Sequence, residues 1–179
     1  MGGSAGGRRL VVPRGRGTRP TSERTREALF SALEAARGTL QGVGFLDLYA
    51  GSGAVGLEAA SRGSAPVLLV EQAPIALAAL RSNVAALELT QVEVIADQVE
   101  RVAARPAPQP FDIAFLDPPY ADPVEPALQL LLDNGWLADG ATVVVERATR
   151  SGAPAWPAGL SEDRARRYGD STLWYGRRP

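Results

Sequence analysis

The tetrapeptide Asp117-Pro118-Pro119-Tyr120 follows an apolar run over residues 111–116 and combines an acid, two prolines and an aromatic ring. Proline fixes φ and donates no N–H, so nearby carbonyls can face a ligand without competition from the chain's own donors. Asp117 and the Pro118 carbonyl can accept from an exocyclic NH2 group, while Tyr120 stacks on the ring that carries it. This geometry suits methyl transfer to an amino nitrogen of a nucleobase. The other interpretation is a proline-rich turn with Tyr120 in the core.

A second set of residues lies at the segment 47–56, where an earlier strand turns into a helix. It contains a literal Gly-x-Gly-x-x-Gly, and Glu71 ends the next strand, a pattern that alone is typical of dinucleotide binding. Asp47, however, would repel a pyrophosphate at this edge. A ligand with a positive sulfonium and an amino group suits that carboxylate better, so we expect S-adenosylmethionine.

In this interpretation Glu71 holds the ribose hydroxyls of the cofactor, and Asp97, after the third strand, accepts from the adenine amino group. Asp97 could instead be a helix cap or a solvated loop acid. The expected cofactor residues are Asp47, Tyr49, Ala50, Gly51, Ser52, Gly53, Glu71, Gln72, Asp97 and Asp117.

Arginines gather at the start of the chain. Residues 1–26 hold seven arginines and one acid, whereas the remaining chain holds twelve arginines and nineteen acids. A basic arm on an acidic body suggests a polyanion partner, although it could also be a disordered solubilising tail. Some of these arginines could instead pair with acids and pin the arm to the core. The expected RNA contacts are Arg8, Arg9, Arg19, Thr21, Arg24 and Arg26.

Composition excludes several other classes. The 179 residues suit one domain with a short appendage. The chain has no cysteine and no histidine, which removes disulfides, zinc–thiolate sites and histidine-based triads, and we expect no metal. It has neither a run of about 18 apolar residues nor a signal-peptide pattern. We therefore expect a cytoplasmic protein without a membrane segment.

Strands alternate with helices through most of the chain, which predicts an α/β fold whose parallel sheet is covered on both faces. A first helix is capped by Thr21 or Ser22 and ended by Gly38. The predicted strands are 43–49, 67–70, 92–96, 111–116 and 141–146, the later helices are 53–62, 74–87, 97–104 and 123–132, and residues 164–168 and 172–175 form a hairpin.

Five stretches together resemble the RsmD family of class I S-adenosylmethionine-dependent methyltransferases. They are residues 6–10, 18–30, 47–63, 117–120 and 168–172, and the Arg-Pro-Thr segment at 19–21 is the most specific. The resemblance implies a Rossmann-like, mostly parallel seven-stranded sheet with a C-terminal antiparallel hairpin. It divides the chain into a basic extended or hairpin arm, 1–20, and a methyltransferase domain, 21–179.

The resemblance also implies a function, methylation of N2 of one guanine in small-subunit (16S) ribosomal RNA. We expect a monomer that acts on this RNA within a small-subunit particle. One departure concerns the arm: the family usually opens with a short apolar strand, whereas this chain starts Met1-Gly2-Gly3-Ser4.

Other functions fit parts of the sequence. A DNA adenine-N6 methyltransferase would use the same residues, 117–120, to hold its base, although no separate sequence-recognition domain is evident. A glutamine-N5 protein methyltransferase usually carries Asn where Asp117 stands. A non-catalytic RNA-binding assembly factor has no need of the full acid and glycine set. An NAD-dependent oxidoreductase leaves the residues at 117–120 unexplained.

Overall fold

The computed structural model describes residues 1–12, 22–119 and 123–179. Its described strands form one sheet in the order β3-β2-β1-β4-β5-β7-β6, in which β7 runs antiparallel to both of its neighbours and the other pairs are parallel. The strands are β1 Phe45–Leu48, β2 Val67–Glu71, β3 Val92–Ala96, β4 Phe111–Leu116, β5 Leu137–Ala148, β6 Ser161–Tyr168 and β7 Ser171–Arg177. The predicted mostly parallel seven-stranded sheet with a C-terminal hairpin is confirmed.

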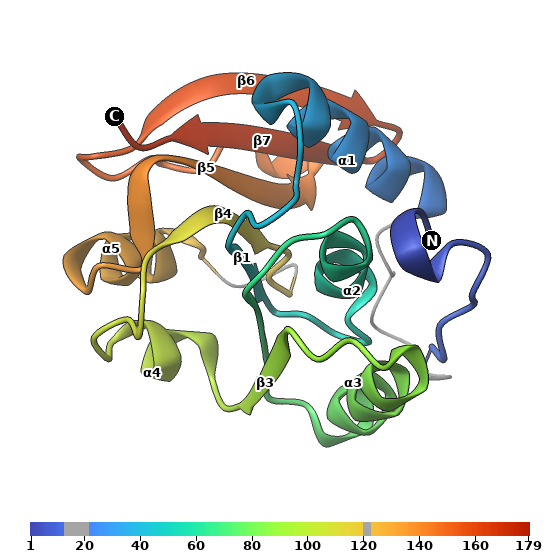
Figure 1. Cartoon of the computed structure of the whole chain (residues 1–179). Coiled ribbons are helices and arrows are strands. Elements are labelled where there is room, and N and C mark those ends of the chain that lie inside the picture. Colours follow the sequence, from blue (N-terminus) through green and yellow to red (C-terminus); the bar gives the residue numbers. More distant parts are fainter. Residues whose placement is uncertain (13–21, 120–122) are drawn as a thin grey trace.

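Helices cover both faces of this sheet, as the alternation of elements predicts (Figure 1). One face carries α1, α2 and α3, and the other carries α4 and α5. The helices are α1 Glu23–Arg37, α2 Ala54–Ser61, α3 Pro74–Leu87, α4 Val99–Ala103 and α5 Glu125–Asp133, with short 3-10 turns η1 Gly3–Ala5 and η2 Thr149–Ser151. Among the described residues, no helix is long and apolar enough to cross a membrane.

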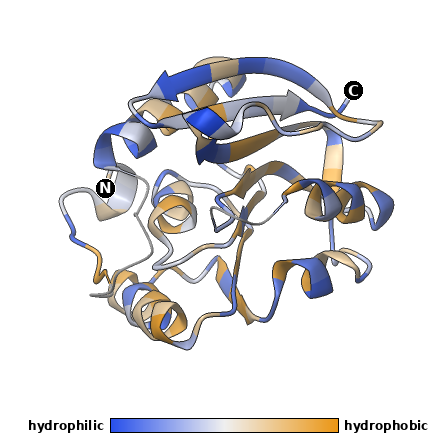
Figure 2. Cartoon of the chain, turned by 180° about the vertical axis from the view of Figure 1, so that it is seen from behind, coloured by the Kyte–Doolittle hydropathy of each residue, from blue (hydrophilic) through white to orange (hydrophobic). Residues whose placement is uncertain are grey.

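The central strands are apolar on both sides because each face meets a helical layer. In β1 every residue is buried, including Asp47. The edge strand β6 is largely hydrophilic and exposed, and its charged side chains discourage pairing with another chain (Figure 2). Strand β5 starts at Leu137, earlier than predicted. Asp139-Gly140 suggests a turn in the sequence, but the chain passes it with a register irregularity, with Gly140 at φ 73°, and continues as strand.

Helix α1 forms as the sequence predicts. The Ser22 hydroxyl accepts from the Thr25 N–H at 3.1 Å, which caps the first turn, and Gly38 at φ 81° ends the helix. Leu29, Phe30 and Leu33 of α1 are fully buried against the sheet.

The start of the chain packs on α2 through one buried carboxylate, Glu58. Its Oε2 accepts from Arg26 Nε at 2.5 Å, and its Oε1 accepts from Arg62 Nη2 at 2.8 Å and from the Gly2 N–H at 3.2 Å. Burial opposes ionisation of Glu58, but bonds from Arg62 and Arg26 outweigh it and hold its pKa below the usual value. These contacts therefore stabilise the fold above the ordinary glutamate pKa and are lost on acidification.

Within residues 1–12, Gly3–Ala5 form the 3-10 turn η1, and residues 8–12 have no regular secondary structure. Ser61 fixes the turn, because its Oγ accepts from the Ala5 N–H at 2.7 Å and donates to the Gly2 carbonyl at 2.7 Å. A hairpin would need residues 13–20, which lie outside the described residues.

We expect Glu58→Gln to lower the free energy of unfolding by about 3 kcal/mol at neutral pH, since two arginines lose their shared charged partner. Urea unfolding followed by circular dichroism measures this change. Glu34→Gln is the matched control: Glu34 also pairs with Arg62, at 3.1 Å, but its side chain is 40% exposed, so the expected loss is under about 1 kcal/mol. Equal losses in the two variants would contradict the assigned role of Glu58.

Candidate active site

The carboxyl edge of the sheet gathers acids because of its strand register. In the parallel pair β4–β5, Leu116 lies opposite Val145. Asp117 and Glu146, each one residue further on, are therefore neighbours, with about 4.8 Å between adjacent strands. Burial raises the pKa of Asp117 well above its ordinary value, and the nearby charges of Glu146 and then Asp47 raise it further.

Asp47 lies in the same acidic group, one strand away. It is opposite Phe115 in the register of β1 and β4, so it projects from the same face of the sheet as Asp117. Its side chain is buried, and Oδ2 accepts from the Gly56 N–H at 2.8 Å. Burial raises the pKa of Asp47 to about 7, although the Gly56 bond lowers it; the charge of Glu71 adds to the increase. A cation bound beside Asp47 would favour its ionised form.

The loop between β1 and α2 has a backbone that a ligand can approach closely. Gly51 has φ 58°, and a side chain there would enter open space, whereas Gly53 has φ 84° and lies against Leu80. Tyr49 also adopts a left-handed conformation, φ 62°, and its hydroxyl donates to Glu100 at 2.8 Å. Strained backbone of this kind is frequent at functional sites. Ala50 and Ser52 are buried within the same loop.

Glu71 fastens this loop to the end of β2. Its Oε2 accepts from the Gly51 N–H at 2.7 Å, and its Oε1 accepts from the N–H groups of Gln72 and Ala73 at 2.8 and 2.7 Å. The Gln72 side chain is exposed beside it. The structure therefore places Glu71 against the glycine loop, and the assignment of Glu71 and Gln72 to the cofactor stays a prediction.

Asp97 is already engaged by the chain. It accepts from the Gln98 N–H at 2.9 Å, from Arg105 at 2.6 Å and from Arg101 at 3.1 Å. The Gln98 bond and then the two arginines hold the pKa of Asp97 below its usual value. Asp97 is not the cap of α4, whose N-cap is Gln98. Like that of Glu71, its carboxylate has three donors within the chain, and its assignment to the adenine amino group stays a prediction.

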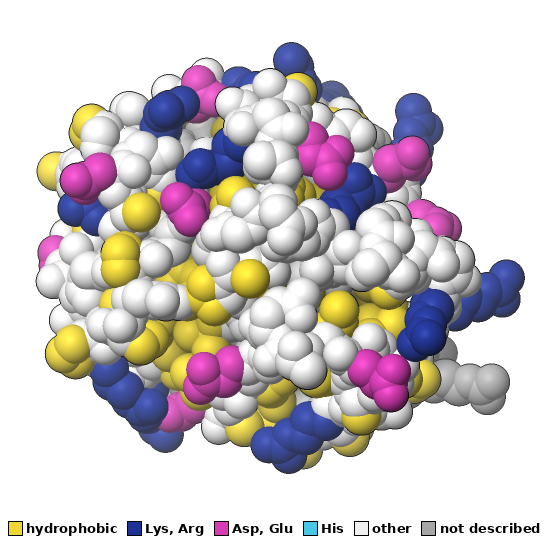
Figure 3. All heavy atoms as spheres, in the orientation of Figure 1, with side chains coloured by type: hydrophobic (Ala, Val, Ile, Leu, Met, Phe, Trp, Pro, Cys, Tyr) yellow, Lys and Arg dark blue, Asp and Glu magenta, His cyan; other side chains and the backbone are white. Residues whose placement is uncertain are grey.

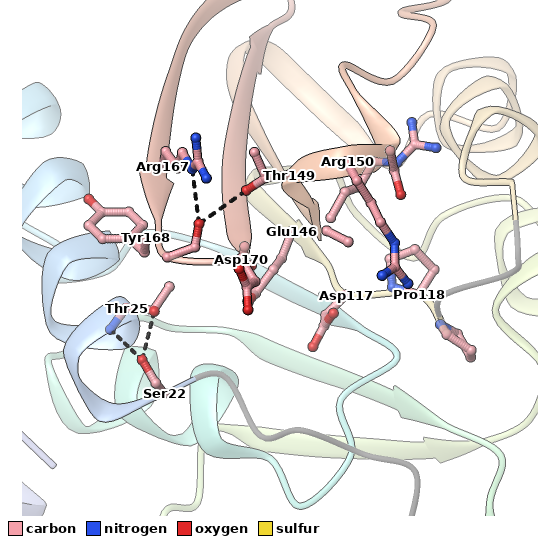
Figure 4. A pocket seen from close by; sticks show the side chains of 16 residues that line it. Ser22, Thr25, Asp117, Pro118, Glu146, Thr149, Arg150, Arg167, Tyr168 and Asp170 are labelled. Atoms are coloured by element: carbon pink, nitrogen blue, oxygen red, sulfur yellow. Dashed lines mark hydrogen bonds between the residues drawn. The ribbon is translucent and has the colours of Figure 1, made fainter.

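A cavity of about 760 Å³ opens beside Asp117 (Figure 4). It lies between the start of α1, the end of β4, the segment after β5 and the β6–β7 turn. Pro118 and Pro119 line it with Asp117, so the structure brings these three predicted residues together. The expected stacking residue, Tyr120, lies outside the described residues. Other residues that line the cavity are Ser22, Thr25, Glu146, Thr149, Arg150, Arg167, Tyr168, Asp170 and Ser171.

Several cavity residues were missed by the sequence reasoning. Glu146 is the clearest case, because it is an acid at the end of the predicted strand 141–146, and the strand-end argument used for Asp117 would have selected it. Asp170 belongs to the β6–β7 turn, where only a hairpin was expected. Arg150 extends from η2 toward Pro118 (Figure 4). The cavity thus has acids near Asp117 and arginines at its margin.

The predicted RNA-binding arginines differ in their surroundings. Arg24 is exposed and lines a smaller cavity of about 300 Å³ together with Arg167 of β6. Arg26, two residues later, is turned inward and bonded to Glu58, so the structure favours the core-pinning alternative for it. Arg8 donates to the Ala86 carbonyl at 2.6 Å, and Arg9 is exposed. Arg19 and Thr21 lie outside the described residues.

Surface charge does not form one broad basic area on the face drawn in Figure 3, where arginines and acids are interspersed.

Asn83 of α3 links the arm to the glycine loop and was also missed. It is buried, and its amide nitrogen donates to the carbonyls of Val11 at 3.0 Å and Ser52 at 2.9 Å, while its oxygen accepts from the Val11 N–H at 2.8 Å. The signal was a polar residue in the apolar stripe formed with Leu80 and Leu87.

Comparison with known proteins supplies the family context. The sequence model of a family described as Conserved hypothetical protein 95 matches residues 1–177. The chain is 40% identical over 162 residues to Ribosomal RNA small subunit methyltransferase D of Escherichia coli K12, covering 90% of this chain and 80% of that protein. It is 37% identical over 144 residues to the protein of the same name from Haemophilus influenzae, covering 78% and 73%.

Solved structures agree with these matches. The Escherichia coli protein yhhF superposes with a TM-score of 0.88 at 36% identity, covering 99% of this chain and 95% of that one. Magnesium protoporphyrin IX methyltransferase from Synechocystis, solved with bound S-adenosylmethionine, superposes with a TM-score of 0.65 at 16% identity, covering 87% and 79%. This second likeness concerns the fold alone.

We expect S-adenosylmethionine to bind more tightly as pH rises. With the pKa of Asp47 at about 7 in the free protein, a bound cation must displace a proton below that pH, so affinity should increase about tenfold between about pH 6 and pH 8. Isothermal titration calorimetry in buffers of different ionisation enthalpy measures both the affinity and the proton release. Asp47→Asn should bind weakly and lose most of this slope, whereas Glu71→Gln should bind weakly and keep it; a flat wild-type profile would contradict the assignment.

Proposed function

The chain belongs to the RsmD family, the ribosomal RNA small subunit methyltransferase D proteins, and from this premise we propose that it methylates the exocyclic N2 amine of one guanine in small-subunit ribosomal RNA. The class I methyltransferase fold and S-adenosylmethionine as cofactor, both expected from the sequence, are confirmed by this membership and by the structural likeness. The observation that carries the proposal is Asp117-Pro118-Pro119 lining a cavity at the same sheet edge as Asp47 and the glycine loop.

The cofactor supplies a methyl group on a positively charged sulfur. Asp47 would offset that charge, and the loop 49–53 would lie along the ligand with its backbone. Glu71 would accept from the ribose hydroxyls in addition to holding the loop. The donor set fits a ligand that carries a positive charge and hydroxyl groups, because the residues facing this edge are carboxylates and backbone.

The chain's task at the base is orientation. The lone pair of an aryl amine is delocalised into its ring, so the amine must be turned toward the methyl group. Asp117 and the Pro118 carbonyl would accept its two N–H bonds, and Tyr120 would hold the base by stacking. After transfer the extra proton leaves through Asp117 or water. Positioning of this kind lowers the barrier without a metal ion.

The base must leave any stack to enter the cavity, so the acceptor guanine is flipped out or presented in a loop. The size of the cavity, about 760 Å³, leaves space for a nucleotide. Arg24 and Arg167, which share the adjoining smaller cavity, are placed to contact the flanking phosphates. The names of the relatives support ribosomal RNA as the substrate. A small-subunit particle would hold that RNA in the shape that exposes the acceptor guanine.

Asp117→Asn should lower the rate of methyl transfer about 10²- to 10³-fold at saturating cofactor, because the amine loses its charged acceptor. The assay uses tritiated S-adenosylmethionine, small subunits from a strain that lacks the equivalent enzyme, and nucleoside analysis after digestion. Label in N2-methylguanosine that depends on Asp117 is the expected result. Asp133→Asn, an exposed acid at the end of α5, is the control. Label in N6-methyladenosine would overturn the substrate, and absence of label in RNA would overturn the proposed function.

Arg24→Gln should weaken binding to the small-subunit RNA and reduce the slope of log affinity against log salt by about 1, since one phosphate contact is lost. Filter binding between about 50 and 200 mM salt measures this slope. Glu27→Gln, an exposed acid of the same helix, is the matched control and should not reduce it. An unchanged slope in Arg24→Gln would exclude Arg24 from the phosphate contacts.

A further inference from the structure

Glu146 lies beside Asp117 in the cavity and takes no part in the mechanism above. Strand register makes the two residues neighbours, and their side chains project from the same face of the sheet. Both can act as acceptors at the same end of the cavity (Figure 4). The structure therefore offers two carboxylates side by side where the base would enter.

The orientation of Glu146 is built in. The Ser171 hydroxyl, at the start of β7, donates to its Oε1 at 2.7 Å, and Glu146 lies opposite Leu173 in the β5–β7 ladder. The β6–β7 turn is also held in place, because the Thr149 N–H donates to the Asp170 carbonyl at 2.8 Å. Two neighbouring strands thus hold the Glu146 side chain at the cavity wall.

Two adjacent acceptors discriminate between purines. The Watson–Crick edge of guanine presents two neighbouring donors, N1–H and the N2 amine, whereas adenine presents an N6 amine next to an N1 acceptor. A carboxylate facing N1 would bond to guanine and repel the N1 lone pair of adenine. Sites built to bond one such group reject the analogue that lacks it far more strongly than apolar pockets do.

We infer that Glu146 is a specificity-determining residue, which accepts from guanine N1–H while Asp117 orients the N2 amine. This inference rests on the proposed function and assigns its choice of base. The donors of guanine relieve the repulsion between two neighbouring carboxylates, so the correct base stabilises an arrangement that the free site disfavours. The competing explanation is that Glu146 only holds the β6–β7 turn through Ser171.

The test exchanges the base and the acceptor together. Small subunits are reconstituted on ribosomal RNA that carries either guanosine or 2-aminopurine ribonucleoside at the acceptor position, located by mapping the methyl group in the wild-type reaction. 2-Aminopurine keeps the amine at C2 but has an unprotonated N1. The wild-type protein should prefer guanosine by roughly 10²-fold or more in kcat/KM.

Glu146→Gln retains a carbonyl that can accept from Ser171 and places an amide N–H donor within reach of an unprotonated N1. The preference for guanosine over 2-aminopurine should therefore fall by at least about tenfold, and because the two bases differ equally at C6 for both proteins, the change reports on N1. Ser171→Ala, which removes the bond that orients Glu146 but keeps its carboxylate, should lower the preference by less than Glu146→Gln does. Cofactor affinity within about twofold of wild type verifies that each variant is folded; Glu146→Ala replaces the Gln variant if that fails, with the same expected fall in preference.

An unchanged preference in the folded Glu146 variant, with both rates lowered alike, would overturn the inference and leave guanine-N2 methylation intact. Absence of guanine methylation by the wild-type protein would instead overturn the proposed function, and the inference with it. The two failures are distinguishable because the first requires an active wild-type enzyme.

Discussion

The parallel register of β1, β4 and β5 is the constraint on which the site depends. It places Asp47, Asp117 and Glu146 on one face at the carboxyl edge. Burial raises the pKa values of Asp47 and Asp117, and repulsion adds to this, from Glu71 at Asp47 and from Glu146 and Asp47 at Asp117. Water cannot compensate fully for this crowding, so the free site is electrostatically unfavourable. In the proposed function, a cationic cofactor at Asp47 and a base that donates to Asp117 and Glu146 would remove this penalty. Repulsion among these acids in the free protein would therefore favour ligands that carry positive charge or hydrogen-bond donors.

Rigidity around these acids comes from ordinary structural bonds. Glu71 holds the glycine loop by three N–H donors, and Ser171 holds Glu146. Away from this site, the buried Glu58 of α2 bonds to Arg26 of α1, to Arg62 and to the Gly2 N–H, and so joins α1, α2 and the first residues. Glu58 differs from Asp47 and Asp117 in one respect: it has charged partners and its pKa is lowered, whereas burial raises the pKa values of Asp47 and Asp117.

Much of this arrangement could be predicted from the sequence, because apolar runs bounded by glycine, proline and acids mark the ends of parallel strands. Asp47, Glu71 and Asp117 were found in this way. Glu146 was not: its place at the end of the predicted strand 141–146 was a local signal, but its position beside Asp117 depends on strand order, which local patterns do not give. The roles of Arg24 and Arg26 could not be separated either: two residues apart on a helix, they point to solvent and to Glu58.

Position along the chain divides the site into two parts. The expected cofactor contacts, except Asp117, lie at 47–97, whereas the cavity proposed for the base is lined, apart from the start of α1, by residues from 117 onward. Strand β4 lies between these two parts of the chain. Sequence changes after β4 could therefore alter the acceptor without disturbing the glycine loop proposed to bind the methyl donor. Changes in the last third of the chain alone would then give this small fold new acceptors.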